Sequence, residues 1–175
     1  MSRSKLLILD ANLVIRLHEL GLWTAVIERY EVRLARTVVE ESMYFEKDGQ
    51  RIELDLTGDI NATKITVFDV EVSDTKRFLA KFDRTYAEKL DVGELESLVH
   101  LDQSTDDLCL ASGDAIVYKV LGLLNRADQG ISLEEALQRI GLSVAGLPWL
   151  CLKAFREKYT TEGQQDFIRG RGLRK

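Results

Sequence analysis

The chain has 175 residues, close to the roughly 150 residues of an average domain, so one domain is expected. Its 24 Lys and Arg against 29 Asp and Glu give a formal net charge of −5. A hydrophobic fraction of 45% and a charged fraction of 30% exclude collagen, low-complexity disorder and a disulfide-dense mini-protein. No apolar run approaches the ~20 residues of a membrane span, and the first apolar stretch is too short for a signal peptide. We therefore expect a cytoplasmic protein without membrane contact.

Apolar and polar residues alternate along the chain in patterns typical of strands and helices. The expected strands cover Lys5–Leu9, Val32–Arg36, Arg51–Leu56, Lys64–Val72, Leu108–Ala111 and Leu142–Ala145. The expected helices cover Asn12–Tyr30 with a break near Gly21, Thr37–Glu46, Ser73–Phe82, Asp91–Leu101, Ala115–Leu124, Ser132–Ile140 and a closing helix from Pro148 through Lys158. This alternation predicts an α/β fold with a mostly parallel central sheet and helices on both faces.

Local signals mark two helix starts and one helix end. Thr37 with Glu40, and Ser132 with Glu135, match the capping box that opens a helix. Gly141 follows the second of these helices and suits its C-terminal stop, because glycine readily adopts the left-handed conformation found there.

The segment 48–72 interrupts the alternation. Arg51–Leu56 alternates with period two, Gly58-Asp59 follows as a turn, and Lys64–Val72 is again strand-like, which predicts an inserted hairpin. The last seven residues, RGRGLRK, carry four positive charges. We expect a single domain over residues 1–160 and a basic tail over residues 161–175.

Cysteine and histidine usage limits the kinds of metal site. Cys109 and Cys151 each lie in an apolar run, which favours buried free thiols over a disulfide. With only His18 and His100 besides, a zinc site of nitrogen and sulfur ligands is not expected. Any bound metal would need oxygen ligands.

Three acidic residues lie just beyond predicted strands. Asp10 follows the first strand, Glu41 lies one turn into the helix after the second, and Asp114 follows LCLASG. The carboxyl ends of parallel strands share the sheet edge where ligands bind, so these side chains should converge. Glu94, which opens a helix, is the fourth candidate. Each acid also has a structural explanation, since Asp is a common N-cap and Asp91 with Glu94 resembles a capping box.

Helical spacing places Glu41 and Glu94 on the apolar faces of their helices. Glu41 shares the apolar face of its helix with Val38, and Glu94 shares one with Leu98. A carboxylate on a core-facing stripe is costly unless it is paired or holds a metal. Several carboxylates in one crevice repel each other, and a divalent cation is the simplest compensation. Hard oxygen ligands suit Mg²⁺ or Mn²⁺.

These segments together resemble the PIN-domain family of metal-dependent ribonucleases, which includes the VapC-type toxins. The matching pieces are LLILDANLVI, TVVEESMYF, LDVGELESL and LCLASGDAIVYKVLGLL, in this order over about residues 5–125. The resemblance implies a PIN-like three-layer fold, a single-stranded RNA substrate and an Mg²⁺ or Mn²⁺ cofactor. It implies that the metal-binding and catalytic acids are Asp10, Glu41, Glu94 and Asp114.

Three further residues are expected to support these acids: Asn12, Asp91 and Ser112. Asn12 matches the polar residue that often follows the first acid by two positions. Ser112-Gly113 stands where many relatives carry Thr or Asp, and residues 48–67 look like an addition to a minimal PIN domain.

An acidic crevice repels RNA, so positive charge is needed around it. The candidates are Arg16, Lys119, Arg126 and the tail residues Arg169, Arg171, Arg174 and Lys175. Trp23 and Trp149 are aromatic residues that can stack on bases. Because both lie at apolar helical positions, we expect both to pack in the core.

Two other functions compete with the nuclease. LLILDANLV also resembles the first motif of haloacid-dehalogenase-type phosphatases, but the second position of that motif is Asn12, which cannot act as an acid or base. A PIN-like fold can also serve as a non-catalytic RNA- or protein-binding module. An antitoxin-like protein partner and a homodimer are further expectations for this chain.

Overall fold

We describe residues 4–174 of the chain from a computed structural model. Across this range no helix has the length and the apolar run that a bilayer crossing requires. The helices and strands, in chain order, are β1 Ser4–Leu9, α1 Ala11–Glu19, α2 Trp23–Arg29, β2 Tyr30–Ala35, α3 Arg36–Glu41, β3 Tyr44–Lys47, β4 Gln50–Glu53, α4 Thr57–Asn61, β5 Ile65–Phe68, α5 Val72–Leu79, α6 Arg84–Ala87, α7 Val92–Gln103, β6 Leu108–Ala111, α8 Ala115–Leu123, η1 Ala127–Gln129, α9 Leu133–Arg139, η2 Trp149–Cys151 and α10 Lys153–Ile168.

The centre of the fold is a four-stranded sheet in the order β5-β2-β1-β6. All three neighbouring pairs are parallel. Every residue of β6 is buried, as are Leu7, Ile8 and Leu9 of β1. Such continuous apolar strands form when both faces of a parallel sheet are covered. The predicted α/β class and parallel central sheet are therefore confirmed.

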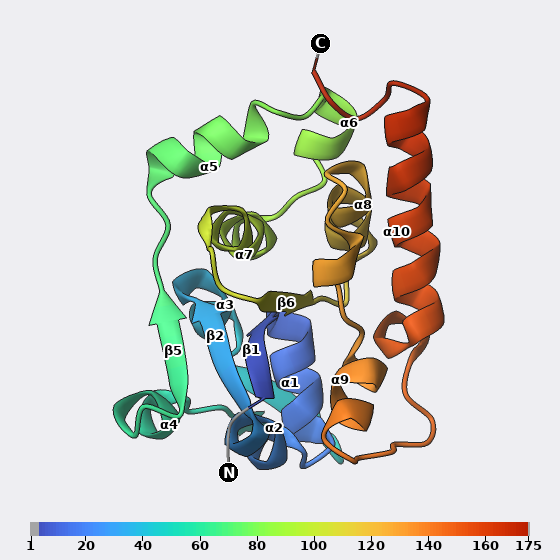
Figure 1. The fold of residues 1–175 in the computed structure, drawn as a ribbon. Helices are drawn as coiled ribbons and strands as arrows, with labels where there is room; N and C mark the ends of the chain where they lie inside the picture. Colours follow the sequence, from blue (N-terminus) through green and yellow to red (C-terminus); the bar gives the residue numbers. More distant parts are fainter. Residues whose placement is uncertain (1–3, 175) are drawn as a thin grey trace.

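The chain crosses the sheet in two directions. The connection from β1 to β2 runs one way, and the connection from β5 to β6 runs the other way across β2 and β1. Because parallel crossovers are right-handed, opposite directions place their helices on opposite faces. α1 and α2 thus cover one face, and α7 covers the other, where it contacts β2 and β6 (Figure 1). The arrangement is compatible with a three-layer α/β fold.

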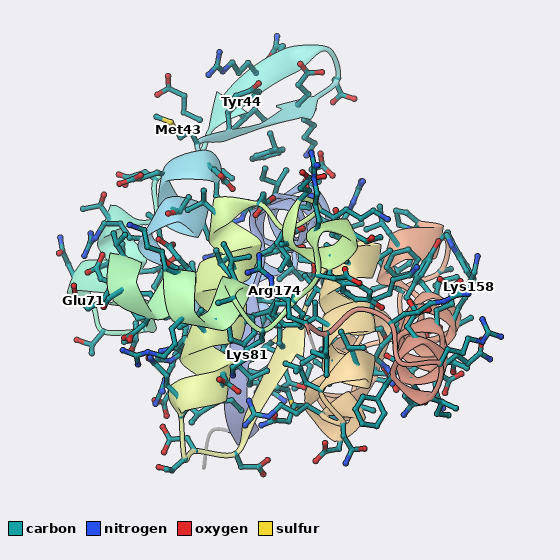
Figure 2. All side chains as sticks on the ribbon, turned by 90° about the horizontal axis from the view of Figure 1, so that it is seen from above. Met43, Tyr44, Glu71, Lys81, Lys158 and Arg174 are labelled. Carbon is teal, nitrogen blue, oxygen red and sulfur yellow. The ribbon has the colours of Figure 1, made fainter. Side chains whose placement is uncertain are left out.

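The inserted hairpin lies earlier in the sequence than predicted. β3 and β4 pair antiparallel from Tyr44 opposite Glu53 to Lys47 opposite Gln50. Asp48 and Gly49 form the turn with φ of 52° and 74°, the left-handed pair that a tight two-residue hairpin needs. In Figure 2 this hairpin, with Tyr44 at its base, projects from the rest of the molecule.

Three boundaries around the hairpin differ from the prediction. The helix expected over Thr37–Glu46 ends at Glu41, because the next residues enter β3. Gly58-Asp59, predicted as a turn, lies within helix α4. The strand expected over Lys64–Val72 is β5, which pairs with β2 at the edge of the central sheet rather than within a hairpin.

The C-terminal third contains two further differences. Leu142–Ala145, predicted as a strand, is a loop, although the predicted stop at Gly141 is present with φ of 78°. α10 continues to Ile168, beyond the predicted end at Lys158. The tail therefore begins later than residue 161, and it docks beside α6 (Figure 1), where the Gly172 carbonyl accepts the Asp83 N–H at 2.8 Å. Lys175 lies outside the described residues.

Helices α8 and α10 lie side by side in very close contact (Figure 1). A Cβ added to Gly163 of α10 would lie 2.0 Å from the carbonyl oxygen of Lys119, and one added to Gly122 of α8 would lie 2.1 Å from that of Thr160. These distances leave no room for a methyl group, so the two backbones pack directly on each other. The crossing holds α10 against the helix that follows β6.

Gly163→Ala should therefore destabilise the protein. Because the added methyl meets a helix backbone, we expect a loss of about 1–3 kcal/mol in the free energy of unfolding, as for overpacked cores. Urea unfolding monitored by circular dichroism measures this loss. Gly58→Ala in α4 is the matched control, since nothing lies within 4 Å of its added Cβ. It should be neutral or stabilising by up to about 1 kcal/mol, and equal midpoints for the two variants would contradict the close crossing.

Candidate active site

The register of the sheet brings the first acid beside the loop that follows β6. Leu9 of β1 lies opposite Ala111 of β6, so Asp10 and Ser112 are the next residues on neighbouring parallel strands. The Asp10 N–H still donates to the Ala111 carbonyl at 3.3 Å. Both chains then turn into helices at the same sheet edge. The predicted convergence of these two strand ends is present.

The carboxylate of Asp10 accepts three hydrogen bonds. Oδ1 accepts the Leu13 N–H at 2.8 Å and so caps α1. Oδ2 accepts the Ser112 hydroxyl at 2.7 Å and the Gly113 N–H at 2.6 Å. The side chain is only 6% exposed. Burial raises the pKa of Asp10, and the three hydrogen bonds oppose that shift.

Ser112 connects Asp10 to the fourth acid. Its Oγ accepts the Asp114 N–H at 2.9 Å, while the Asp114 carboxylate caps α8 by accepting the Ile116 N–H at 3.0 Å. The buried Tyr118 hydroxyl accepts the Ser112 N–H and donates toward the carbonyls of Ser112 and Ile131. The loop after β6 is thus fixed on both sides.

Glu94 and Asp91 form the predicted capping box at the start of α7. Asp91 Oδ1 accepts the Glu94 N–H at 2.8 Å, and Glu94 Oε2 accepts the Asp91 N–H at 3.1 Å. Glu94 is 6% exposed. Burial, reinforced by the negative charges of Asp114, Asp91 and Asp10, raises the pKa of Glu94 to about 8. This carboxyl therefore keeps its proton to a higher pH than an ordinary glutamate does.

Glu41 ends α3 and is exposed, so the core-facing position expected for it is wrong. Partial burial, and then the negative charges of Asp91, Glu96, Asp10 and Glu40, raise its pKa.

The capping box expected of Thr37 and Glu40 is also absent. Ala35 is the N-cap of α3, and no side chain caps this helix. Because α3 begins at Arg36, directly after β2, Thr37 lies inside the first turn rather than at the cap position. The exposed Glu40 therefore has no capping role.

Asp10, Glu41 and Glu94 line a cavity of about 330 Å³ at the carboxyl edge of the sheet. Its lining residues are Asp10, Ala11, Asn12, Ile15, Val38, Glu41, Asp91, Gly93 and Glu94. We call this cavity the carboxylate cleft. Asp114 is not among its lining residues, although its charge raises the pKa values of Asp10 and Glu94. A Cβ added to Gly93 would lie 3.2 Å from Val38 Cγ2 and 3.5 Å from Glu41 Oε2, so α7 packs closely against α3 at the cleft.

The predicted RNA-binding cations lie outside the cleft lining, and several are paired. Arg16 forms an ion pair with Glu19 at 2.6 Å on α1, the helix that begins beside the cleft. Lys119 pairs with Glu162 at 2.8 Å and Arg126 pairs with Asp102 at 3.1 Å. Arg169 and Arg171 are exposed at the end of the chain that docks beside α6.

The two tryptophans differ from each other. Trp23 is 6% exposed, as predicted, and its indole N–H donates to Asp59 at 2.8 Å. Trp149 is 50% exposed, so its predicted core position is wrong.

The predicted buried free thiols are present at Cys109 and Cys151.

Two residues of the site were not predicted from the sequence. Glu96 raises the pKa of Glu41, and its Oε2 is buried without a hydrogen-bond partner. Tyr118 holds the loop that contains Ser112. Its hydroxyl stands four residues after Asp114, on a helix in which Lys119 is the other residue with a polar side-chain group.

The acids raise one another's pKa values, but their side chains are spread around the cleft. Within residues 4–174, no three or more His, Cys, Asp or Glu side chains are grouped so that they could hold a metal ion as they stand. No known protein family matches the chain, and no curated protein is a significant match. The family resemblance of the motifs stays a prediction, and the functional argument rests on the cleft.

The raised pKa of Glu94 predicts how stability depends on pH. Between the ordinary value of 4.5 and about 8, the folded protein binds more protons than the unfolded chain. The free energy of unfolding should therefore fall as pH rises through this window, by up to about 1.4 kcal/mol per pH unit for one proton. The raised pKa values of Asp10 and Glu41 act in the same direction. Urea unfolding at several pH values measures the slope.

Glu94→Gln should flatten this slope and keep the capping box, since a Gln amide oxygen also accepts the Asp91 N–H. The control is Glu28→Gln, an exposed residue of α2 outside the cleft, which should keep the wild-type slope. An unchanged slope in Glu94→Gln would show that this carboxyl does not carry the pH dependence.

Proposed function

We propose that the protein is a divalent-metal-dependent ribonuclease of the PIN-like type, which hydrolyses phosphodiester bonds of single-stranded RNA. The observation that carries the proposal is the convergence of Asp10, Glu41 and Glu94 on one cleft, with Asp114 beside it. They come from the ends of β1, α3 and β6 and from the start of α7, at the sheet edge where α/β proteins bind ligands. A PIN-like three-layer architecture is part of this proposal.

The chemistry of this donor set suits Mg²⁺ or Mn²⁺, which prefer carboxylate oxygens. Burial and mutual repulsion raise the pKa values of Asp10, Glu41 and Glu94. A bound cation would offset the repulsion that protonation otherwise reduces. Asp10, Glu41, Glu94 and Asp114 would hold the metal, and the exposed Glu41 has the freedom to turn toward it. When bound, the ion supplies Lewis-acid activation of water and neutralises charge on the scissile phosphate.

The chain's own residues have distinct tasks in this reaction. Asp10 is held rigidly by its three hydrogen bonds, which fixes one carboxylate relative to the substrate. Glu94, whose pKa is raised by burial and by neighbouring carboxylates, would give up its proton to become a ligand of a cation in the cleft. Asn12 is exposed in the cleft lining, where its amide can donate to a phosphate oxygen.

A non-catalytic binding module is the second candidate, and the bonding of Asp10 favours it. Both oxygens of this carboxylate already accept hydrogen bonds from the protein, as expected of a purely structural N-cap. An antitoxin-like protein partner or a homodimer belongs to either proposal. The phosphatase alternative needs a second acid where Asn12 stands.

Metal binding should be visible as added stability. A ligand that binds only the folded state adds about 2.7 kcal/mol at a hundredfold excess over its Kd. Mn²⁺ should therefore raise the melting temperature, and EDTA should reverse the rise. Because Glu94 must lose a proton, the rise should be larger at pH 8 than at pH 6. Calorimetry with and without Mn²⁺ at both pH values measures it, and an unchanged melting temperature at millimolar metal would falsify the metal site.

Catalysis is tested best at the adjacent pair Glu40 and Glu41. Both are exposed on α3, so neither substitution should disturb the fold, but Glu41 lines the cleft and Glu40 does not. Glu41→Gln should lower cleavage of single-stranded RNA in Mn²⁺ by about a hundredfold or more, whereas Glu40→Gln should leave it unchanged. Gel analysis of labelled RNA fragments measures the rates.

Three results would change the assignment. RNA bound but not cleaved by the wild type in Mn²⁺ would favour the binding module. Hydrolysis of a small phosphomonoester would favour the phosphatase. A silent Glu41→Gln with a damaging Glu40→Gln would mean that the second acid of the motif is Glu40. Asp10→Asn is a poorer test, because its NH₂ group would face hydrogen-bond donors and destabilise the loop after β6.

A further inference from the structure

Trp149 is a large aromatic side chain with half of its surface in solvent. Trp23 shows the alternative for the same residue type, since it is buried and its N–H is paired with Asp59. Exposed indoles are enriched where proteins bind ligands, because one flat apolar group gives a large contact area. The surroundings of Trp149 indicate which ligand.

The segment that carries Trp149 adjoins the carboxylate cleft. A Cβ added to Gly113 would lie 3.1 Å from Leu150 Cδ1, 3.6 Å from Asn12 Cβ and 3.8 Å from Asp10 Oδ2. Leu150, the next residue after Trp149, thus packs where the cleft-lining Asn12 and Asp10 meet the loop after β6. The following residue, Cys151, is buried, and after burial itself the charges of Arg16 and Asp10 influence its pKa.

The indole is held in place by packing rather than left mobile. Pro148 starts the short helix η2, in which the Cys151 N–H donates to the Pro148 carbonyl at 2.9 Å. The Trp149 ring meets Phe155 of α10 edge to face, with ring centroids 6.0 Å apart. Phe155 meets Tyr118 in the same way, and the Tyr118 hydroxyl holds Ser112, the partner of Asp10. The aromatic chain therefore fixes the position of Trp149 relative to Asp10.

Charge beside this aromatic platform favours a nucleic acid. Burial raises the pKa of Cys151, and the positive charge of Arg16 on α1 opposes that rise, so Arg16 lies near this segment, where it also forms an ion pair with Glu19. A rigid aromatic plane combined with a cation is how proteins bind single-stranded nucleic acid, with bases stacked on the ring and phosphates near the positive charge. A duplex keeps its bases stacked inside, so an unpaired strand fits this arrangement.

We propose that Trp149 stacks on a nucleobase of a single-stranded RNA whose adjoining phosphate enters the carboxylate cleft. The inference rests on the proposed function for the choice of RNA, but it concerns binding and not cleavage. Trp149 is then a positioning residue, which sets the nucleotide that lies over Asp10 and Glu41. Stacking on an indole accepts any base, so this contact gives affinity and register with little sequence preference.

Binding is measured with the full-length chain in EDTA, which prevents metal-dependent cleavage, by fluorescence anisotropy of a labelled oligouridine. Trp149→Ala should weaken binding on the order of tenfold, the usual effect of removing one stacked base contact. Trp149→Phe should retain most of the affinity, because a benzene ring still stacks. Phe167→Ala is the matched control: Phe167 is 56% exposed near the other end of α10, the end beside α6 (Figure 1), and its loss should change nothing.

Tryptophan fluorescence provides a second readout. Oligouridine should quench the emission of the wild type and should not quench that of Trp149→Phe, in which Trp23 is the remaining tryptophan. Equal RNA affinity of wild type and Trp149→Ala, or no RNA binding by the wild type, would overturn the stacking proposal. Quenching through Trp149 without cleavage in Mn²⁺ would support stacking and refute the nuclease. Normal cleavage and affinity in Trp149→Ala would refute stacking and leave the nuclease in place.

Discussion

The Asp10 carboxylate is the interaction on which the candidate site depends. One side chain caps α1 through the Leu13 N–H and holds the loop after β6 through Ser112 and Gly113. It therefore joins two neighbouring strands and the helices that follow them at one point. The two buried elements could separate only by leaving a carboxylate or its donors unpaired, which costs more than the bonds themselves contribute. The same geometry that makes the sheet edge rigid also places a carboxyl group in the lining of the cleft.

Structural and chemical roles overlap at the other acids too. Glu94 completes the capping box of α7, yet it is buried near Asp10 and Asp114, whose charges raise its pKa. A helix could be capped by Asp91 alone at much lower electrostatic cost. The cleft thus holds more carboxyl groups than the fold requires, and their raised pKa values favour a cation or another positive ligand there.

The sequence predicted the strand ends well and the first residues of the helices less well. Asp10 and Ser112 could be placed because continuous apolar runs define buried parallel strands and the following residue must lie at the sheet edge. The boxes Ser132–Glu135 and Asp91–Glu94 were correct, but Thr37–Glu40 was not. The motif alone cannot show that α3 starts directly from β2 at Arg36. The exposure of Trp149 was missed because it depends on how η2 packs beside Gly113, a contact between residues far apart in sequence.

The direct backbone contact between α8 and α10 has a consequence for how the protein is made. α10 is synthesised after every strand of the sheet, and at roughly 5–20 residues per second the segment between the two helices takes seconds to emerge. Until then the groove along Gly122 has no occupant, and Tyr118 lacks the Phe155 ring that supports it. The aromatic packing behind the loop after β6 is thus completed last. A nascent chain that has already formed its sheet therefore lacks the packing of α10 behind the loop after β6 until the final helix docks.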